Sequence, residues 1–243
     1  MPVDSWFYCV TLLFMAKLLY LHGADSNVGS EHLIKDKDAR NRMRFIYKLA
    51  GGAKNVISFN APFFANPDES EKRSWFINPK DENEARDPIY LSKAMFQIGE
   101  SIKCITQEVR ERGVKPQDLI LCGASQGGFM ALYLALHSII TPKQTIAIVP
   151  FFPSDMLTNL LNDKNQVKKL MEKLPGQNSP EILWASVEND EFISENMRST
   201  WRKLYSLRII DYISCSNSKH GVWTNKFKND IMEWKNRQHI KCV

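Results

Sequence analysis

The stretch from Leu119 to Phe129 constrains this chain more than any other, because an apolar run of strand length leads directly into Gly-Ala-Ser-Gln-Gly-Gly and then into helix-forming residues. A Gly-x-Ser-x-Gly pattern arises by chance in many proteins, but between a strand and a helix it is typical of a serine held on a sharp turn. Such a serine is strained, and the residues two before and two after it pass very close together. Gly123 and Gly127 have no Cβ to collide there, so we interpret Ser125 as a candidate nucleophile.

Strands and helices alternate along the rest of the chain. The longest expected helix begins at Asp87-Pro88, a capping residue followed by proline in the first turn, and is closed by Gly113. The alternation predicts an α/β fold with a mostly parallel central sheet and helices on both faces. In such sheets the functional residues lie at the carboxyl ends of the strands. The expected strands are 17–21, 55–59, 117–122, 144–149, 181–187 and 207–213.

The composition suits one such domain, spanning residues 17–243. Of the 243 residues, 44% are apolar and 24% are charged, and the net charge is +5. The basic residues are scattered rather than gathered with aromatic residues, which argues against a nucleic-acid partner and leaves a transient contact with anionic lipid open. The five cysteines have neither metal-ligand nor redox-motif spacing, and this usage suits a reducing, cytoplasmic compartment. We expect a monomer or a weak homodimer.

The N-terminal extension, residues 1–16, contains an apolar run over 6–16 that resembles the hydrophobic part of a signal peptide. Asp4 without a preceding Lys or Arg, and the bulky Phe14 near the cleavage position, argue against a signal peptide. The run is also shorter than the about 20 residues of a membrane span. Two alternatives stay open: the run attaches the protein to a membrane, or Met15 is the true start of an over-extended gene. Detection of a peptide upstream of Met15 by mass spectrometry would exclude the second.

Two segments are candidate lids. Residues 63–87 form the longest irregular stretch and are crowded with charge, and loops of this length are usually functional or disordered. A solvated loop has no need of the apolar pair Trp75 and Phe76 in its middle, so we expect both to pack at the mouth of a pocket and to bind substrate. The second segment, 152–175, contains Phe152, which we also expect to bind substrate.

A serine nucleophile requires a base that takes its proton and an acid that orients the base. In folds that carry this strand-turn-helix motif, the chain order is serine, acid, histidine. Among the five histidines, His220 and His239 come late enough. His239 lies beyond the final helix, whereas His220 lies in the loop after the last expected strand. We therefore predict His220 as the base for Ser125.

The acid should follow the fifth expected strand. Asp190 is favoured because the apolar residues 192–193 can anchor its loop in the core, and Glu188 is the alternative. The reaction also requires N–H donors aimed at the oxygen on which negative charge develops. We expect the backbone N–H groups of Gln126, directly after the serine, and of Ala24, in the loop after the first strand, to form this oxyanion hole.

These motifs together resemble the phospholipase/carboxylesterase group of α/β-hydrolases, which includes acyl-protein thioesterases. The resemblance extends from about residue 17 to residue 235. The nucleophile motif of the group, Gly-Phe-Ser-Gln-Gly-Gly, is similar to residues 123–128, and its Leu-His-Gly with a following Asp is similar to residues 21–25. Its Ala-Pro and its Trp-aromatic pair are similar to residues 61–62 and 75–76, and its acid motif, Asp-x-x-Val, is similar to residues 190–193.

The resemblance implies a serine esterase or thioesterase that cleaves small-molecule or acylated substrates through an acyl-enzyme, with Ser125, Asp190 and His220 as its triad and with no metal or organic cofactor. The chain departs from the group where Val187-Glu188 replaces His-Gly before the acid and where Lys219 precedes the histidine. Two alternatives stay open. One is a related group of small serine hydrolases with an Arg-x-Trp-Phe segment, and the other is a non-catalytic binding protein with the same fold.

Overall fold

The computed structural model describes most of the chain. Residues 1–15, which contain nearly all of the apolar N-terminal run, lie outside the described part, as does the second candidate lid with Phe152 apart from two isolated positions. The described residues are 16–24, 36–64, 72–79, 83–84, 87–151, 168, 172, 181–188, 190–216 and 219–240.

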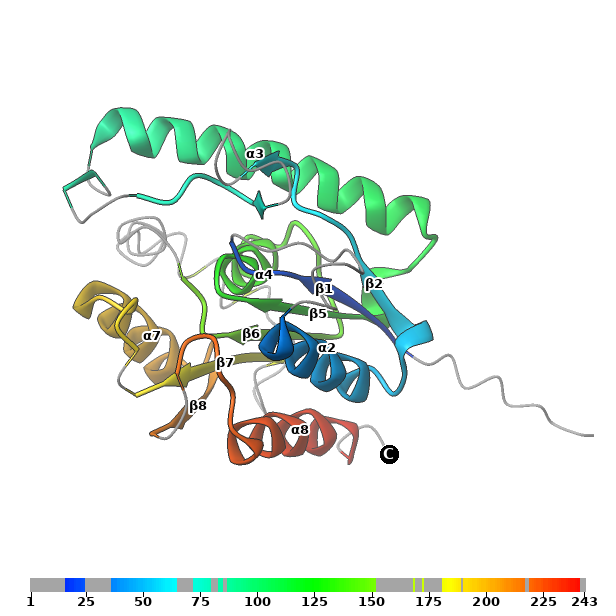
Figure 1. Ribbon diagram of the computed structural model, residues 1–243. Coiled ribbons are helices and arrows are strands. Elements are labelled where there is room, and N and C mark those ends of the chain that lie inside the picture. Colours follow the sequence, from blue (N-terminus) through cyan, green and yellow to red (C-terminus); the bar gives the residue numbers. More distant parts are fainter. Residues whose placement is uncertain are drawn as a thin grey trace, which may run out of the picture.

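A sheet of six parallel strands forms the centre of the molecule (Figure 1). The strand order is β2-β1-β5-β6-β7-β8, which confirms the predicted mostly parallel sheet. The order reverses between β1 and β5, and ligands of open α/β sheets bind at the carboxyl ends of the strands at such a point. The strands are β1 (Lys17–Leu21), β2 (Val56–Ser58), β5 (Leu119–Ala124), β6 (Gln144–Ile148), β7 (Ile182–Val187) and β8 (Asp211–Cys215).

Helices cover both faces of this sheet, because alternate residues of each strand point to opposite sides. Leu19 and Leu21 belong to the core on one face, with α3, α4 and α7, whereas Leu18 and Tyr20 belong to the core on the other, with α2 and α8. Figure 1 shows α3 above the sheet and α2 and α8 below it. The helices are α2 (Lys37–Leu49), α3 (Pro88–Glu111), α4 (Gln126–Leu136), α7 (Glu195–Ser206) and α8 (Asn225–Ile240), with short 3₁₀ turns η1 (Ala53–Asn55) and η3 (Pro116–Asp118).

The helix ends follow the sequence signals. Asp87 caps α3 by accepting the N–H of Ile89 at 2.8 Å, and Gly113 follows the helix with φ of 62°. Asp36 caps α2 in the same way, accepting the N–H groups of two residues of its first turn. These caps fix where α2 and α3 begin.

The described parts of the segment 63–87, residues 63–64, 72–79, 83–84 and 87, include paired strands and core residues. Phe63–Phe64 (β3) pairs antiparallel with Arg73–Ser74 (β4). Trp75 and Phe76 are both 0% exposed. The prediction that they pack at the mouth of a pocket is therefore wrong: both are core residues, and they lie between α3 and the end of β1.

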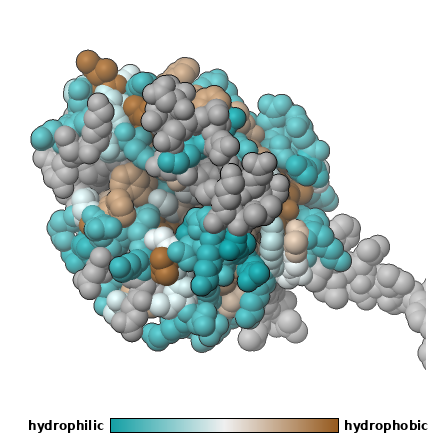
Figure 2. Space-filling model, viewed as in Figure 1, coloured by the Kyte–Doolittle hydropathy of each residue, from teal (hydrophilic) through white to brown (hydrophobic). Residues whose placement is uncertain are grey.

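The visible surface is mainly hydrophilic, with scattered apolar side chains (Figure 2). Within the described ranges, none of the helices has both the length and the apolar content needed to cross a membrane. In the same ranges, no three His, Cys, Asp or Glu side chains are grouped so that they could hold a metal ion.

Candidate active site

Ser125 lies on a strained turn between β5 and α4. Its φ of 52° and ψ of −122° are unfavourable for a residue with a side chain. A Cβ on Gly123 would lie 2.0 Å from the carbonyl oxygen of Gly127, as the spacing predicts. A Cβ on Gly127 would instead lie 2.1 Å from the carbonyl oxygen of Leu21, because α4 begins directly against the end of β1. Both glycines are required by the close approach of main chains.

The structure brings the three predicted residues of the triad together. His220 Nε2 lies 2.9 Å from Ser125 Oγ, and His220 Nδ1 lies 2.7 Å from Asp190 Oδ2. The Asp190 side chain is 0% exposed and that of His220 is 18% exposed. An ionised carboxylate only accepts hydrogen bonds, so Nδ1 carries the proton that it donates to Asp190, and Nε2 is left to accept the Ser125 hydroxyl. The arrangement is that of a nucleophile, a base and an orienting acid.

The acid is held by the main chain that follows it. Asp190 Oδ1 accepts the N–H of Phe192 at 3.0 Å, which fixes the carboxylate in addition to its bond with the histidine. Ile193 is buried at 6% exposure, as expected, but Phe192 is 51% exposed, so the expectation that both residues anchor the loop in the core is wrong for Phe192. Glu188, the alternative acid, is exposed on the turn after β7.

The histidine turn is held by residues that sequence reasoning missed. Arg42 on α2 donates to the carbonyl oxygen of Gly221 at 2.7 Å, and the indole N–H of Trp223 donates to the carbonyl oxygen of His220 at 3.2 Å. Phe45, also on α2, packs edge-on against the Trp223 ring. Arg42 and Gly221 are 179 positions apart, and no local pattern links them.

Two aromatic rings border the site. The Phe192 ring centroid lies 4.8 Å from that of His220 and 6.4 Å from that of Phe151. The main chain of Phe151 is bonded to the residue of the nucleophile, since its N–H donates to the carbonyl oxygen of Ser125 at 3.1 Å. Phe152, the predicted substrate-binding residue next in the chain, lies outside the described residues. The exposed Phe192 is a substrate-contact candidate that sequence reasoning missed.

The candidate oxyanion donors lie on either side of Ser125. Gln126 is the first residue of α4, where backbone N–H groups have no acceptor within the helix. On the other side, a Cβ on Gly23 would lie 3.3 Å from the Cβ of Ser125, so the loop after β1 runs directly beside the nucleophile. Ala24 is the next residue. Gln126 and Ala24 therefore lie on either side of Ser125, and their role as an oxyanion hole stays a prediction.

His22, which precedes this loop, is a structural residue. It is 2% exposed, and its Nε2 accepts the N–H of Ala61 at 3.0 Å. Its Nδ1 lies 2.6 Å from the carbonyl oxygen of Gly23, which places the ring proton on Nδ1. Cys122, in the strand before the elbow, is a core residue as expected, and burial raises the pKa of its thiol.

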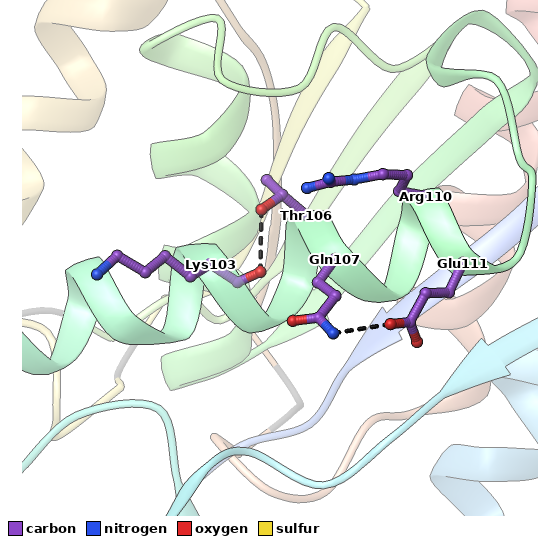
Figure 3. A pocket seen from close by; sticks show the side chains of 5 residues that line it. All are labelled: Lys103, Thr106, Gln107, Arg110 and Glu111. Carbon is purple, nitrogen blue, oxygen red and sulfur yellow. Dashed lines mark hydrogen bonds between the residues drawn. The ribbon is translucent and has the colours of Figure 1, made fainter.

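A surface hollow of about 310 Å³ lies elsewhere, along α3. Figure 3 shows that its five labelled residues all belong to this helix. Lys103 forms an ion pair with Glu100, and Gln107 donates a hydrogen bond to Glu111. None of the five touches the triad, and side chains of both charges line the hollow. The candidate active site is therefore the triad, and this hollow is separate from it. The lining residues are Lys103, Thr106, Gln107, Arg110 and Glu111.

No family model matches the sequence, and no curated protein matches it. Solved structures do match the fold. SOBER1 from Arabidopsis thaliana has a TM-score of 0.59 at 21% identity, covering 92% of this chain and 98% of its own. Esterase PE8 has a TM-score of 0.62 at 17% identity, covering 92% of both chains. The Bacillus cereus carboxylesterase has a TM-score of 0.58 at 15% identity, covering 91% of this chain and 88% of its own.

The chain therefore has the α/β-hydrolase fold, as predicted. The predicted resemblance to the phospholipase/carboxylesterase group is confirmed at the level of this fold, since an esterase and a carboxylesterase are among the solved structures that share it. The similarity covers 91–92% of this chain and 88–98% of these neighbours, so it extends over nearly the whole length of each.

Proposed function

We propose that this protein is a serine hydrolase that cleaves carboxylic esters or acyl thioesters through an acyl-enzyme. The observation that carries the proposal is the unbroken hydrogen-bonded series from Ser125 through His220 to Asp190, with 2.9 Å and 2.7 Å between the paired atoms. The strained backbone of Ser125 and the similarity in fold to an esterase and a carboxylesterase support it.

In the first half of the reaction, Ser125 Oγ attacks the carbonyl carbon of the substrate while its proton passes to His220 Nε2. Asp190 stabilises the resulting imidazolium through the bond at Nδ1. Negative charge develops on the carbonyl oxygen, and the N–H groups of Gln126 and Ala24 are the proposed donors to it. The tetrahedral intermediate collapses, the bond to the alcohol or thiol breaks, and the leaving group takes the proton from Nε2.

In the second half, water attacks the acyl-Ser125 ester in the same way. His220 Nε2 takes a proton from the water, the acyl carbon–Oγ bond breaks, and Oγ recovers its proton from Nε2. The products are a carboxylic acid and the alcohol or thiol, with one water consumed. No metal or organic cofactor has a step in this sequence.

The aromatic pair beside the triad favours substrates with apolar groups. Phe192 is half-exposed and contacts the ring of His220, the residue that protonates the leaving group. The Phe151 ring packs edge-on against that of Phe192 and extends this apolar surface. Burial of an aromatic or alkyl group against these rings would remove apolar surface from water and favour binding.

Hydrolysis of p-nitrophenyl esters with acyl chains of increasing length, together with that of a peptide carrying an S-acylated cysteine, tests the proposal. We expect hydrolysis by the wild type and labelling by a fluorophosphonate probe, with both lost in Ser125→Ala. Removing the nucleophile should lower kcat by about 10⁶-fold.

The outcomes separate the alternatives. A wild type that neither hydrolyses any of these substrates nor reacts with the probe would overturn the proposal and favour a binding protein with this fold. A clear preference for the acylated peptide over the esters would identify a thioesterase. A preference for the shortest esters, with acyl groups of about two to four carbons, would argue against a lipid or acyl-protein substrate.

A further inference from the structure

The side chain of Gln126 does more than follow the nucleophile. It is 0% exposed, and its amide makes all four hydrogen bonds available to such a group. Oε1 accepts the Trp75 N–H at 2.9 Å, and it shares the Ser74 hydroxyl, also at 2.9 Å, with the carbonyl oxygen of Phe76, which lies 2.5 Å from that hydroxyl. Nε2 donates to the carbonyl oxygen of Phe76 and to Asn78 Oδ1, both at 2.7 Å. The first residue of α4 is thereby locked to the segment 74–78.

The same segment also binds the loop on the other side of Ser125. The indole N–H of Trp75 donates to the carbonyl oxygen of His22 at 2.7 Å, and the two rings lie 5.4 Å apart. His22 directly precedes Gly23, which runs beside Ser125, and Ala24. Gln126 and His22, which lies two residues before Ala24, are therefore both hydrogen-bonded to one buried piece of chain, residues 74–76.

Helix α3 fixes this segment from outside. The Ser101 hydroxyl donates to the carbonyl oxygen of Trp75 at 2.6 Å. The main chain of Ile77 bonds at both of its groups: its N–H donates to Gln97 Oε1 at 2.7 Å, and its carbonyl oxygen accepts the Tyr90 hydroxyl at 3.0 Å. These hydrogen bonds are buried or partly buried, where they are stronger than in water, so the segment is a rigid support.

We propose that the 74–78 segment is a positioning device that sets the spacing of the Gln126 and Ala24 amides, with the Gln126 side chain and the Trp75 indole as its positioning residues. The inference rests on the proposed hydrolase function. Oxyanion donors act only when they lie within about 2.7–3.1 Å of the oxygen that becomes charged. The two amides belong to separate parts of the chain, the loop after β1 and the start of α4. A support bonded to His22, two residues before Ala24, and to Gln126 keeps that distance constant during the reaction.

Two variants test this. Gln126→Met keeps the length of the side chain and the backbone N–H but removes all four side-chain hydrogen bonds. Trp75→Phe keeps an aromatic ring and removes only the bond to His22. The matched control is Trp234→Phe, which also loses one indole hydrogen bond, to Asp211, but on the opposite face of the sheet.

The expected result is a fall in kcat for p-nitrophenyl butyrate of about 10- to 100-fold in both test variants, since misplacing a reacting group by about 1 Å costs up to about 100-fold. KM should stay within about threefold, because the donors act on the transition state and not on the bound ester. The inhibition constant of phenylboronic acid, which forms a tetrahedral adduct with a serine, should rise by the same factor as kcat falls. Trp234→Phe should leave kcat, KM and this constant unchanged.

Other results overturn the inference. It fails when the folded variants, checked by near-ultraviolet circular dichroism, keep wild-type kcat and phenylboronic acid affinity, or when the Trp234→Phe control loses as much of both. Trp75→Phe alone decides the matter should Gln126→Met not fold. Activity that is abolished by Ser125→Ala but unaffected in both test variants overturns this inference and leaves the hydrolase function standing. A wild type without hydrolysis overturns both.

Discussion

Replacing Asp190 with asparagine tests the triad directly, because the two carboxylate oxygens have different partners. Oδ2 lies 2.7 Å from His220 Nδ1, and Oδ1 accepts the Phe192 N–H at 3.0 Å. An asparagine has only one oxygen, so it cannot accept at both positions. With its oxygen towards Phe192, its NH₂ group donates to Nδ1 and forces the ring proton onto Nε2. His220 then cannot accept the proton of Ser125.

The expected loss follows from this wrong tautomer. In a serine triad it lowers kcat by about 10⁴, which is about 5.4 kcal/mol of barrier at 1.36 kcal/mol for each factor of ten. The opposite orientation of the amide would set its NH₂ group against the Phe192 N–H and leave a buried donor unsatisfied, at a cost of about 1–3 kcal/mol in stability. The first orientation is therefore favoured, and Asp190→Asn should fold normally.

The assay is the initial rate of p-nitrophenyl butyrate hydrolysis, measured with the free energy of unfolding in urea. Glu188→Gln is the matched control, because it neutralises the alternative acid, which is exposed. It should keep kcat within about twofold and change stability by less than about 0.5 kcal/mol. A rate for Asp190→Asn within about tenfold of the wild type, or an equal loss in Glu188→Gln, would refute the tautomer argument.

Four further changes have expected outcomes. Gly123→Ala places a Cβ 2.0 Å from a main-chain oxygen and should lower kcat by about 100-fold, as an activity assay would measure. Gly99→Ala, whose Cβ would meet nothing within 4 Å, should raise the free energy of unfolding by about 0.5–1 kcal/mol in urea denaturation. Phe192→Ala removes the exposed ring beside the base and should raise KM by about fivefold to tenfold with little change in kcat, measured with p-nitrophenyl butyrate. Burial raises the pKa of the Cys122 thiol, so peptide mapping of the native protein after iodoacetamide at pH 8 should find it unmodified. Burial lowers the pKa of His137 from 6.5, so the unfolded chain binds the proton more readily; stability should fall as the pH drops through about 6.5, and His137→Phe should weaken this dependence in urea denaturation at a series of pH values.

The strands were predictable where their ends coincide with a change of periodicity. The expected strands 144–149 and 181–187 differ from β6 and β7 by one residue at one end. The last strand, expected at 207–213, is observed at Asp211–Cys215. Its apolar start instead ends α7: Leu207 caps the helix, Arg208 has φ of 55°, and the next two residues are 1% exposed. An apolar run indicates burial, and a turn can supply burial as well as a strand.

The candidate site was predictable where residues act at fixed places in the chain order. Ser125, Asp190 and His220 each follow the end of a strand, and the ends of parallel strands meet at one edge of a sheet. The supports were not predictable, because they depend on which distant elements pack together. Arg42 at the histidine turn is one example, and the four hydrogen bonds of the Gln126 side chain are another. The burial of Trp75 was misread because an apolar pair in a charged loop suits a core and a pocket equally well.

The parallel sheet has a consequence for how the strained turn at Ser125 forms during folding. β1 pairs Lys17 with Leu119, so a long stretch of chain must be looped before the central strands meet. Sheets built from such distant pairings form slowly, on the order of milliseconds to seconds. The strained conformation of Ser125 is held by β6, since its N–H donates to the carbonyl oxygen of Ile148 at 2.9 Å. A partly folded chain in which β6 has not yet paired with β5 therefore lacks the hydrogen bond that holds the turn at Ser125, so this turn forms together with the sheet.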